Sequence, residues 1–218
     1  LGIGGLQGQG QQDFLECLFG IKKLKAGKMF LNGEEINLSG PSEAMKKGIA
    51  YLPAERKTEG LFVSHTIAFN LTFACLDALS NRIGTIIKKR EQEQLAMAFK
   101  AFSIKANGPN QIIGELSGGN QQKVVLAKWL ARNPKLLLLN EPTRGIDVGT
   151  KKEIYELMMK LASSGVSIIM ISSDTMELIG MCDRVITIYE QEINYELLSN
   201  DLTEETLVKA SVFRRSGN

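Results

Sequence analysis

Along this chain, continuous apolar runs alternate with segments whose apolar residues recur at helical spacing. Four continuous apolar runs, typical of strands buried in a parallel sheet, lie at residues 1–6, 48–53, 135–139 and 166–171. Four segments with apolar residues on one helical face lie at residues 64–78, 91–102, 148–162 and 203–212. Strands that alternate with helices predict an α/β fold with a mainly parallel sheet.

Two further segments predict hairpins, and with them an antiparallel β portion. Residues 28–38 alternate around an Asn-Gly dipeptide that favours a tight hairpin turn, and residues 184–197 predict a second hairpin. A short helix is expected at residues 41–47, with Ser39 or Ser42 as its N-cap.

Composition narrows the class of protein. The 218 residues suit one domain, or one with a small subdomain, and the hydrophobic content of 44% is enough for a buried core. The net charge of +2 does not favour nucleic acid or an anionic membrane as a partner. No apolar run reaches membrane-spanning length and no signal peptide is visible, so we expect a soluble, cytoplasmic chain. The start inside a strand-like run, without Met, predicts a fragment of a longer polypeptide, and residues 213–218 are expected to fray.

The stretch at residues 114–132 is the clearest candidate for binding a ligand. A Ser-Gly-Gly turn leads there into a segment of helical spacing, and Ser117 is a good N-cap because its hydroxyl can accept from a free amide. Gly118 and Gly119 let the backbone approach a ligand closely. The amides and the positive dipole end of such a helix start favour a phosphate. An ordinary capped core helix is the alternative that the spacing leaves open.

Two motifs in the second half of the chain resemble those of the ATP-binding cassette (ABC) family. Residues 116–123 read Leu-Ser-Gly-Gly-Asn-Gln-Gln-Lys, and residues 136–147 read Leu-Leu-Leu-Leu-Asn-Glu-Pro-Thr-Arg-Gly-Ile-Asp. The endings of both motifs are similar to the monosaccharide-importer branch, of the ribose, xylose and galactose type, whose ATPase subunit carries two cassettes. The resemblance covers nearly the whole chain. It implies one P-loop NTPase-like cassette over residues 1–218, the C-terminal one of the tandem, with a helical subdomain at about 62–132 that includes the start of the signature helix.

A strand, a Gly-rich loop and a helix follow one another at the start of the chain, as in a phosphate-binding P-loop. The resemblance assigns nucleotide binding to Gly5, Gly8, Gly10, Gln11, Gln12 and Asp13. Gln11 stands where the family has the lysine that offsets phosphate charge, and Gln12 where it has the hydroxyl that holds Mg²⁺. Asp13 adds a negative charge near the expected phosphates, at a cost of about 1 kcal/mol or more. We therefore expect weak ATP binding here, with a Gly-rich turn that binds no ligand as the alternative.

The resemblance also assigns roles to residues that follow later strands. Asn140 replaces the Walker B aspartate, which should weaken its hold on Mg²⁺, whereas Glu141 matches the catalytic base that polarises the attacking water. Ser173 replaces the switch histidine and cannot carry its charge. Asp147 matches the D-loop and is also a candidate N-cap of the next helix.

The segment Ala54, Glu55 and Arg56 stands at the position of the family's Q-loop. That loop joins the core to the helical subdomain and touches the membrane subunit, so the resemblance implies a coupling loop here. Ala54 and Glu55 depart from the usual glutamine. A charged surface loop is the alternative.

These motifs together imply one cassette of an importer that uses ATP and Mg²⁺ to power sugar uptake. In the family, two cassettes meet head to tail, and each ATP lies between the P-loop of one and the signature of the other. The intact signature is expected to act in trans through Leu116, Ser117, Gly118, Gly119, Asn120 and Gln121. The chain's own P-loop, Walker B and switch positions are degenerate. This half alone is therefore expected to be poorly active or inactive, with no metal site in the isolated domain.

The resemblance implies partners as well. They are another cassette in the same or a paired chain, transmembrane permease subunits and, indirectly, a periplasmic or extracellular solute-binding protein, with no nucleic acid. Such a chain would lie at the inner face of the cell membrane as a peripheral protein. Two alternatives are a nucleoside-importer cassette and a pseudo-cassette that binds partners without turning over nucleotide.

Overall fold

The computed structural model describes residues 1–214, so the last four residues of the predicted frayed end lie outside it. Backbone contacts divide the chain into two compact units. The first, which we call the sheet unit, comprises residues 1–51, 135–142 and the chain from 158 onward. The second, which we call the helical unit, comprises residues 52–134 and 143–157.

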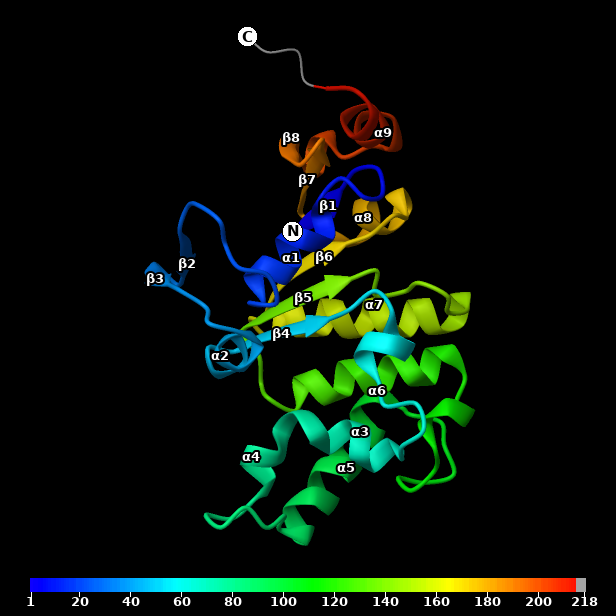
Figure 1. Ribbon diagram of the computed structural model, residues 1–218. Coiled ribbons are helices and arrows are strands. Elements are labelled where there is room, and N and C mark those ends of the chain that lie inside the picture. The colour runs from blue at the N-terminus through cyan, green and yellow to red at the C-terminus, as the bar shows by residue number, and fades with distance from the viewer. Residues whose placement is uncertain (215–218) are drawn as a thin grey trace. The chain divides into compact units, whose positions relative to one another are not determined.

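The sheet unit is built on six strands in the order β4-β5-β6-β1-β7-β8 (Figure 1). Their bounds are β1 Gly2–Gly4, β4 Ile49–Leu52, β5 Leu136–Asn140, β6 Ser167–Ile171, β7 Arg184–Tyr189 and β8 Glu192–Leu198. Strand β1 pairs in parallel with both β6 and β7, and β5 pairs in parallel with β6. These pairings confirm the predicted α/β class with a mainly parallel sheet.

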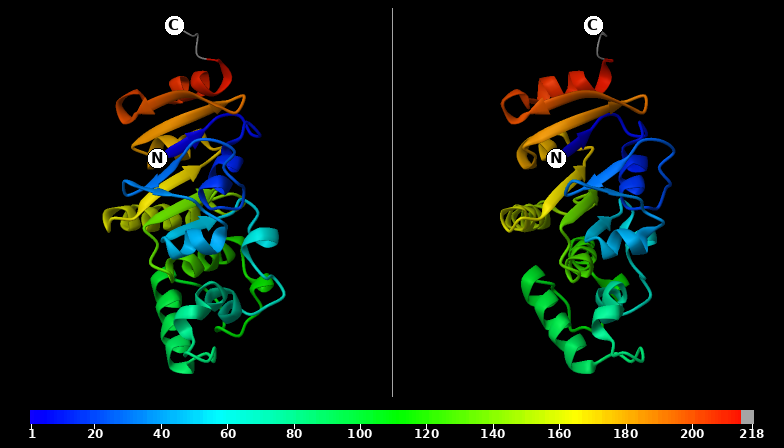
Figure 2. Two further views of the ribbon diagram at one scale, coloured as in Figure 1. Left: turned by 60° about the vertical axis from the view of Figure 1, so that its left-hand side comes forward. Right: turned by 90° about the vertical axis from the view of Figure 1, so that its left-hand side faces the viewer.

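Two antiparallel pairs complete the strands. The hairpin of β7 and β8 lies next to β1 at one edge of the sheet, as both views of Figure 2 show. Strands β2 (Met29–Leu31) and β3 (Glu34–Ile36) form a separate two-stranded sheet. Both hairpins were predicted from the sequence, and both predictions are confirmed.

The sheet unit also contains the helices α1 Gln11–Leu18, α2 Pro41–Lys46, α8 Thr175–Met181 and α9 Glu204–Val212. Helices α8 and α9 pack close to β1, because Gly4 has no side chain where the methyl groups of Leu178 and Leu207 lie. Thr203 caps α9, since its hydroxyl accepts from the Thr206 amide. Helix α8 was not predicted from the sequence.

The cap expected for α2 was wrong. Gly40 occupies the N-cap position, and no side chain caps the helix. The Ser39 amide and hydroxyl both donate to the Glu43 carboxylate at 2.8 Å, so this serine contacts the first turn in a different way. Pro41 stands at the first helical position, where its missing N–H costs nothing.

The parallel strands bring three loops to one edge of the sheet. Because β6 lies between β5 and β1 and all three run in the same direction, their carboxyl ends meet at that edge. The Gly-rich loop follows β1, Glu141 follows β5, and Ser173 follows β6 closely. This edge is where ligands bind in open α/β sheets.

The helical unit contains α3 Ile67–Thr72, α4 Leu76–Leu79, α5 Lys88–Phe102, α6 Gly118–Leu130 and the N-terminal part of α7 Val148–Ser163. Helices α3, α5 and α6 pack on one another around side chains that include Leu71, Val124 and Leu126, which are fully buried. Asn70 is also buried, and its amide group exchanges hydrogen bonds with both backbone groups of Phe62 at 2.8 and 3.0 Å. This polar contact fixes the segment that leads into α3.

Two predicted helices of this unit have different bounds. The segment 64–78 is not one helix, since α3 ends at Thr72 and a 3₁₀ turn, Phe73–Cys75, separates it from α4. The Thr72 hydroxyl donates to the Ala68 carbonyl at 2.9 Å, a contact that competes with regular helix geometry. Helix α5 begins at Lys88, three positions before the predicted start.

No helix within residues 1–214 is long and apolar enough to cross a membrane.

Candidate nucleotide and signature sites

The Gly-rich loop after β1 depends on glycines with a left-handed backbone. Gly5 and Gly10 have φ angles of 126° and 106°, which other L-residues rarely adopt. Gly5 also lies against the Ile188 carbonyl, where a Cβ would clash. Gln9 holds the loop to the turn between β7 and β8, because its side-chain and main-chain oxygens accept from the amides of Glu190 and Gln191.

The Gln11 side chain folds back into this loop. It is only 7% exposed, its Oε1 accepts from the Gln9 amide at 3.1 Å, and its Nε2 donates to the Leu6 carbonyl at 2.9 Å. The carboxamide therefore bridges two sides of the loop. It also uses the Gln9 N–H, a backbone donor of the kind that P-loops offer to phosphate.

The next two predicted nucleotide residues also have partners inside the protein. Gln12 Nε2 donates to Glu16 Oε1 at 2.7 Å, and the Lys22 ammonium pairs with Asp13 and, at 2.8 Å, with Glu16. The hydrogen bond to Asp13 is the main reason why the pKa of Lys22 lies above its usual value. The repulsive charge expected at Asp13 is therefore offset by a neighbouring cation.

The end of β5 places Asn140 and Glu141 side by side. Asn140 is 3% exposed, and its Nδ2 has no hydrogen-bond partner among the described residues. Glu141 has a φ angle of 51°, an uncommon conformation that is held by a 3.0 Å hydrogen bond from its amide to the Ile171 carbonyl. The Glu141 carboxylate in turn accepts from the Ser173 amide at 2.8 Å and from the Ser173 hydroxyl at 3.1 Å.

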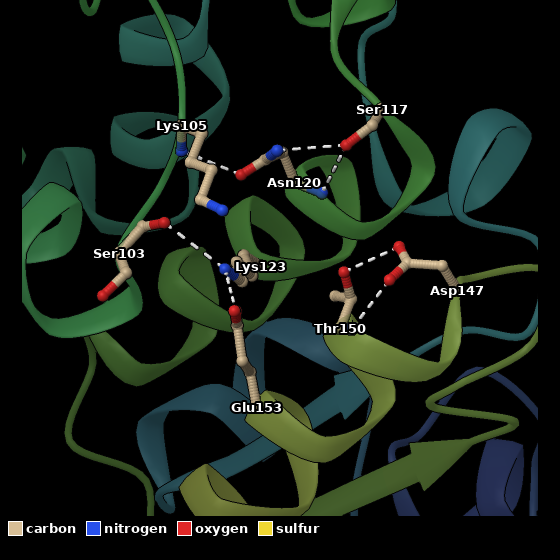
Figure 3. Close-up of polar contacts among 8 residues, drawn as sticks. All are labelled: Ser103, Lys105, Ser117, Asn120, Lys123, Asp147, Thr150 and Glu153. Atoms are coloured by element: carbon tan, nitrogen blue, oxygen red, sulfur yellow. Dashed lines mark hydrogen bonds and ion pairs between the residues drawn. The ribbon is translucent and has the colours of Figure 1, made fainter.

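The sheet unit thus brings together the predicted P-loop, Walker B and switch positions at one edge. The predicted signature and D-loop residues lie in the helical unit. Ser117 is the N-cap of α6, as predicted, and its hydroxyl accepts from the Asn120 amide at 3.4 Å and from Asn120 Nδ2 at 3.0 Å (Figure 3). Gly119 is buried against α7, because a Cβ there would lie 2.6 Å from the Thr150 side chain.

Asp147 caps the start of α7, as predicted. Its Oδ1 accepts from the Thr150 amide at 2.9 Å and its Oδ2 from the Thr150 hydroxyl at 2.8 Å (Figure 3). These hydrogen bonds, the amide first, lower the pKa of the Asp147 carboxyl below its usual value. The cap satisfies a helix amide that has no partner within the helix.

The six predicted signature residues differ in exposure. Ser117 is exposed, whereas Leu116 and Gln121 are buried. Gln121 Nε2 donates to the carbonyls of Ile113 at 3.3 Å and Leu116 at 3.2 Å, so its side chain holds the segment before the helix. Gly118 is half-buried and lies against Arg56, because a Cβ there would be 2.6 Å from Nη2 of that residue.

Arg56 connects the predicted coupling loop to the predicted D-loop. Its Nη1 and Nη2 donate to the carbonyls of Arg144 at 2.8 Å and Gly145 at 3.3 Å. The neighbouring Glu55 carboxylate pairs with the Arg144 guanidinium at 2.8 Å. Ala54 precedes both in a bend and is half-buried. Burial lowers the pKa of Arg56, which nevertheless stays charged at physiological pH.

Sequence reasoning missed an ion pair between a buried lysine and an exposed glutamate beneath the signature. Lys123 is 5% exposed, pairs with Glu153 of α7, and donates to the Ser103 carbonyl at 3.3 Å (Figure 3). The signal in the sequence was a lysine that precedes the apolar run Val124-Val125-Leu126, where a buried face was expected. This contact links α6 to the end of α5 and to α7.

A mainly parallel sheet with a Gly-rich loop after its β1 strand, together with a helix that starts at Ser-Gly-Gly in a helical unit, defines an ATP-binding cassette. The chain belongs to the ABC transporter family, whose model matches residues 1–144. The predicted resemblance to that family is confirmed.

Curated relatives and solved structures agree with this assignment. The chain is 45% identical to the ribose import ATP-binding protein RbsA 1 of Mesorhizobium japonicum, over 97% of this chain and 41% of the relative. It is 43% identical to the ribose import ATP-binding protein RbsA of Caldanaerobacter subterraneus, over 97% of this chain and 43% of the relative. The chain therefore spans less than half the length of these relatives.

Two solved structures share the fold. One is a nucleotide-free ATP-binding cassette from an ABC transporter, with a TM-score of 0.82 and 18% identity over 98% of this chain and 87% of that chain. The other is a dimeric ATP-binding cassette bound to ADP and phosphate after hydrolysis, with a TM-score of 0.77 and 22% identity over 91% of this chain and 84% of that chain.

Proposed function

We propose that this chain is one cassette of a tandem ATPase subunit that powers monosaccharide import, and that it contributes its signature in trans to ATP held by another cassette. The relatives at 45% and 43% identity carry the name of ribose import proteins, which favours a sugar of this class. The coverage of 41% and 43% of those relatives leaves room for a second cassette of similar size.

The observation that carries the proposal is the position of the Gln11 side chain. A P-loop binds phosphate with a lysine and with backbone amides that point into the loop. Gln11 supplies no positive charge, and its carboxamide lies across the loop between Gln9 and Leu6. A phosphate would have to displace both hydrogen bonds without gaining the ionic contact that a lysine makes. We therefore infer weak ATP binding at this chain's own loop.

The residues that would hold Mg²⁺ do not fit that ion. Magnesium prefers carboxylate, hydroxyl and water oxygens in near-octahedral geometry. Gln12 offers a neutral amide that is bonded to Glu16, and Asn140 offers a neutral amide in place of a carboxylate. We assign no step of hydrolysis to a metal at this loop.

The acidic residue after β5 is held in a way that suits a structural role. Glu141 receives two hydrogen bonds from Ser173, at 2.8 and 3.1 Å. A serine at this position cannot supply the charge of an imidazolium to a phosphate. We infer that the chain's own site turns over ATP negligibly.

The start of α6 contrasts with the Gly-rich loop. It keeps a serine N-cap, two glycines and the positive end of a helix dipole, all suited to an anion. The dimeric cassette structure that shares this fold holds ADP and phosphate, which supports a pairing of two cassettes for this chain as well. Ser117, Gly118 and Gly119 would then stabilise the γ-phosphate of an ATP bound by the partner.

The remaining partners follow from the same proposal. The loop of Glu55 and Arg56 would face a transmembrane permease, which would place the chain at the inner face of the membrane. A solute-binding protein would deliver the sugar to that permease. Crosslinking from cysteines placed at residues 54–61 to the permease tests this contact, and crosslinks only from residues 184–197 would contradict it.

Titration calorimetry of this chain with Mg-ATP tests the central inference about its own site. We expect a dissociation constant weaker than about 100 µM and no measurable phosphate release. Submicromolar binding with phosphate release would contradict the proposal. If the signature also proves dispensable for uptake, a pseudo-cassette that only binds partners becomes the better account.

A further inference from the structure

The hydroxyl oxygen of Ser117 accepts two hydrogen bonds from one residue. Asn120 Nδ2 lies 3.0 Å from Ser117 Oγ, and the Asn120 backbone amide lies 3.4 Å from the same oxygen (Figure 3). The backbone contact is the usual N-cap bond. The side-chain contact is an additional one that a cap does not require.

A third residue fixes the orientation of the Asn120 amide group. The Lys105 backbone N–H donates to Asn120 Oδ1 at 2.8 Å (Figure 3). Because a backbone N–H can only donate, the atom that faces it must be the oxygen. The other end of the carboxamide, which faces Ser117, must then be the NH₂ group, and it can only donate.

The position of the Ser117 proton follows from this arrangement. A serine oxygen has two lone pairs and one O–H. Asn120 uses both lone pairs, so the proton of Ser117 points away from Asn120. No residue in the described part of the chain accepts that proton, and Ser117 is exposed at the start of α6. The hydroxyl is therefore set as a donor toward solvent, beside the positive end of the helix dipole.

Asn120 is itself held firmly. Lys105 follows the end of α5, and the carbonyl of Ser103 at that end accepts from the buried Lys123 ammonium at 3.3 Å. Lys123 also pairs with Glu153 of α7, so three helices fix the segment that orients Asn120 (Figure 3). A group pre-organised in this way loses little entropy when a ligand arrives.

We infer that Asn120 is a positioning residue, which keeps the Ser117 hydroxyl as a hydrogen-bond donor to the phosphate of an ATP held by the partner cassette. This inference rests on the proposed function in trans. It also changes the role expected for Asn120 from a direct contact to an indirect one, because both polar ends of its side chain are used within the helical unit.

A double-mutant cycle in the full-length polypeptide, assembled with its permease, tests the inference. Asn120→Leu keeps the size of the side chain and removes its donor, and it should lower kcat for ATP hydrolysis about tenfold. On a Ser117→Ala background the same change should lower kcat by less than about twofold, because the hydroxyl it positions is absent. Asn110→Leu, at an exposed asparagine of a nearby loop, is the matched control and should leave kcat unchanged.

A second variant separates positioning from folding. Asn120→Asp keeps an oxygen for the Lys105 amide but accepts the Ser117 proton instead of donating to Ser117. It should lose at least as much kcat as Asn120→Leu. Full activity of Asn120→Asp, or an equal loss from Asn120→Leu in both Ser117 backgrounds, would overturn the inference and leave the proposed function intact. If Ser117→Ala alone has no effect, the proposed function itself fails, and the inference fails with it.

Discussion

Ser173 donates both its amide and its hydroxyl to the carboxylate of Glu141, at 2.8 and 3.1 Å. The contact joins the ends of two parallel strands, β5 and β6, at the edge of the sheet where the Gly-rich loop also lies. The acidic residue that the family resemblance assigns to the catalytic-base position is thus held by the serine that it assigns to the switch-histidine position.

Glu141→Gln should have little effect on the whole ATPase. Since the chain's own site is proposed to be silent, kcat for ATP hydrolysis by the full-length polypeptide should fall by less than about twofold. The matched control is the same change at the corresponding acidic residue of the partner cassette, which should reduce kcat by at least about 100-fold. Comparable losses from the two changes would show that both sites hydrolyse ATP.

Restoring the missing ligands should restore nucleotide binding. The triple variant Gln11→Lys, Gln12→Ser and Asn140→Asp returns a cation, a hydroxyl and a carboxylate, and should tighten Mg-ATP binding at least about tenfold in calorimetry. Hydrolysis need not follow, because Ser173 remains. Gln7→Lys is the matched control, since it adds the same charge at an exposed position of the same loop. No gain from the triple variant would mean that the loop backbone itself cannot receive phosphate.

Arg56→Ala should weaken the start of the signature helix and the D-loop together. The guanidinium donates to carbonyls at residues 144 and 145, and these acceptors lose a charge-assisted partner when it is removed. We expect ATP-driven uptake to fall about tenfold in Arg56→Ala. Uptake should recover partly in Arg56→Lys, which keeps the positive charge but not the two N–H donors that reach both carbonyls. Arg82→Ala, at an exposed arginine elsewhere in the helical unit, should change uptake little. Equal effects of Arg56→Ala and Arg82→Ala would argue against this connection.

Burial of Lys128 should make the free energy of unfolding depend on pH. Burial lowers the pKa of its ammonium, which donates to the Gly60 carbonyl at 2.6 Å, from 10.5 to about 8. Between these values the unfolded chain binds the proton more tightly than the folded chain, so the free energy of unfolding should rise with pH from about 8 to 10.5. Urea unfolding of this chain across that range should show the rise, and Lys128→Met should reduce it.

The control for that measurement is Lys100→Met, since Lys100 is an exposed lysine on α5. It should leave the slope of unfolding free energy against pH unchanged. A slope that is identical in the Lys128→Met variant and the parent would show that the folded chain does not disfavour the Lys128 proton.

The helix caps and the central strands could be predicted from the sequence, because they depend on residues close together in the chain. The caps at Ser117 and Asp147 each follow from one side chain and the amide three positions later, so their residue types were sufficient. The central strands were predicted from continuous apolar runs, because a strand that is buried on both faces needs apolar residues at successive positions. The family motifs then connected these elements to a cassette.

Contacts between distant segments could not be predicted in this way. The Gln11 side chain folds into the loop because it donates a hydrogen bond to the Leu6 carbonyl. The Arg56 guanidinium donates to two carbonyls that lie almost ninety positions later in the chain. Helix α8 is short, and the break after Thr72 depends on a side-chain hydrogen bond to the backbone. These features depend on tertiary packing, and the spacing of apolar residues along the sequence does not predict such packing.

We propose that this chain contributes its signature to a partner's ATP while its own Gly-rich loop is dispensable. ATP-driven uptake by the full transporter, measured side by side for Ser117→Arg and Asp13→Ala, distinguishes these two roles. Ser117→Arg should abolish uptake, because the bulky side chain blocks the approach of two cassettes even though its charge suits phosphate. Asp13→Ala should leave most of the uptake, because Asp13 pairs with Lys22 beside a loop that we propose does not turn over ATP. Uptake that survives Ser117→Arg would contradict the claim.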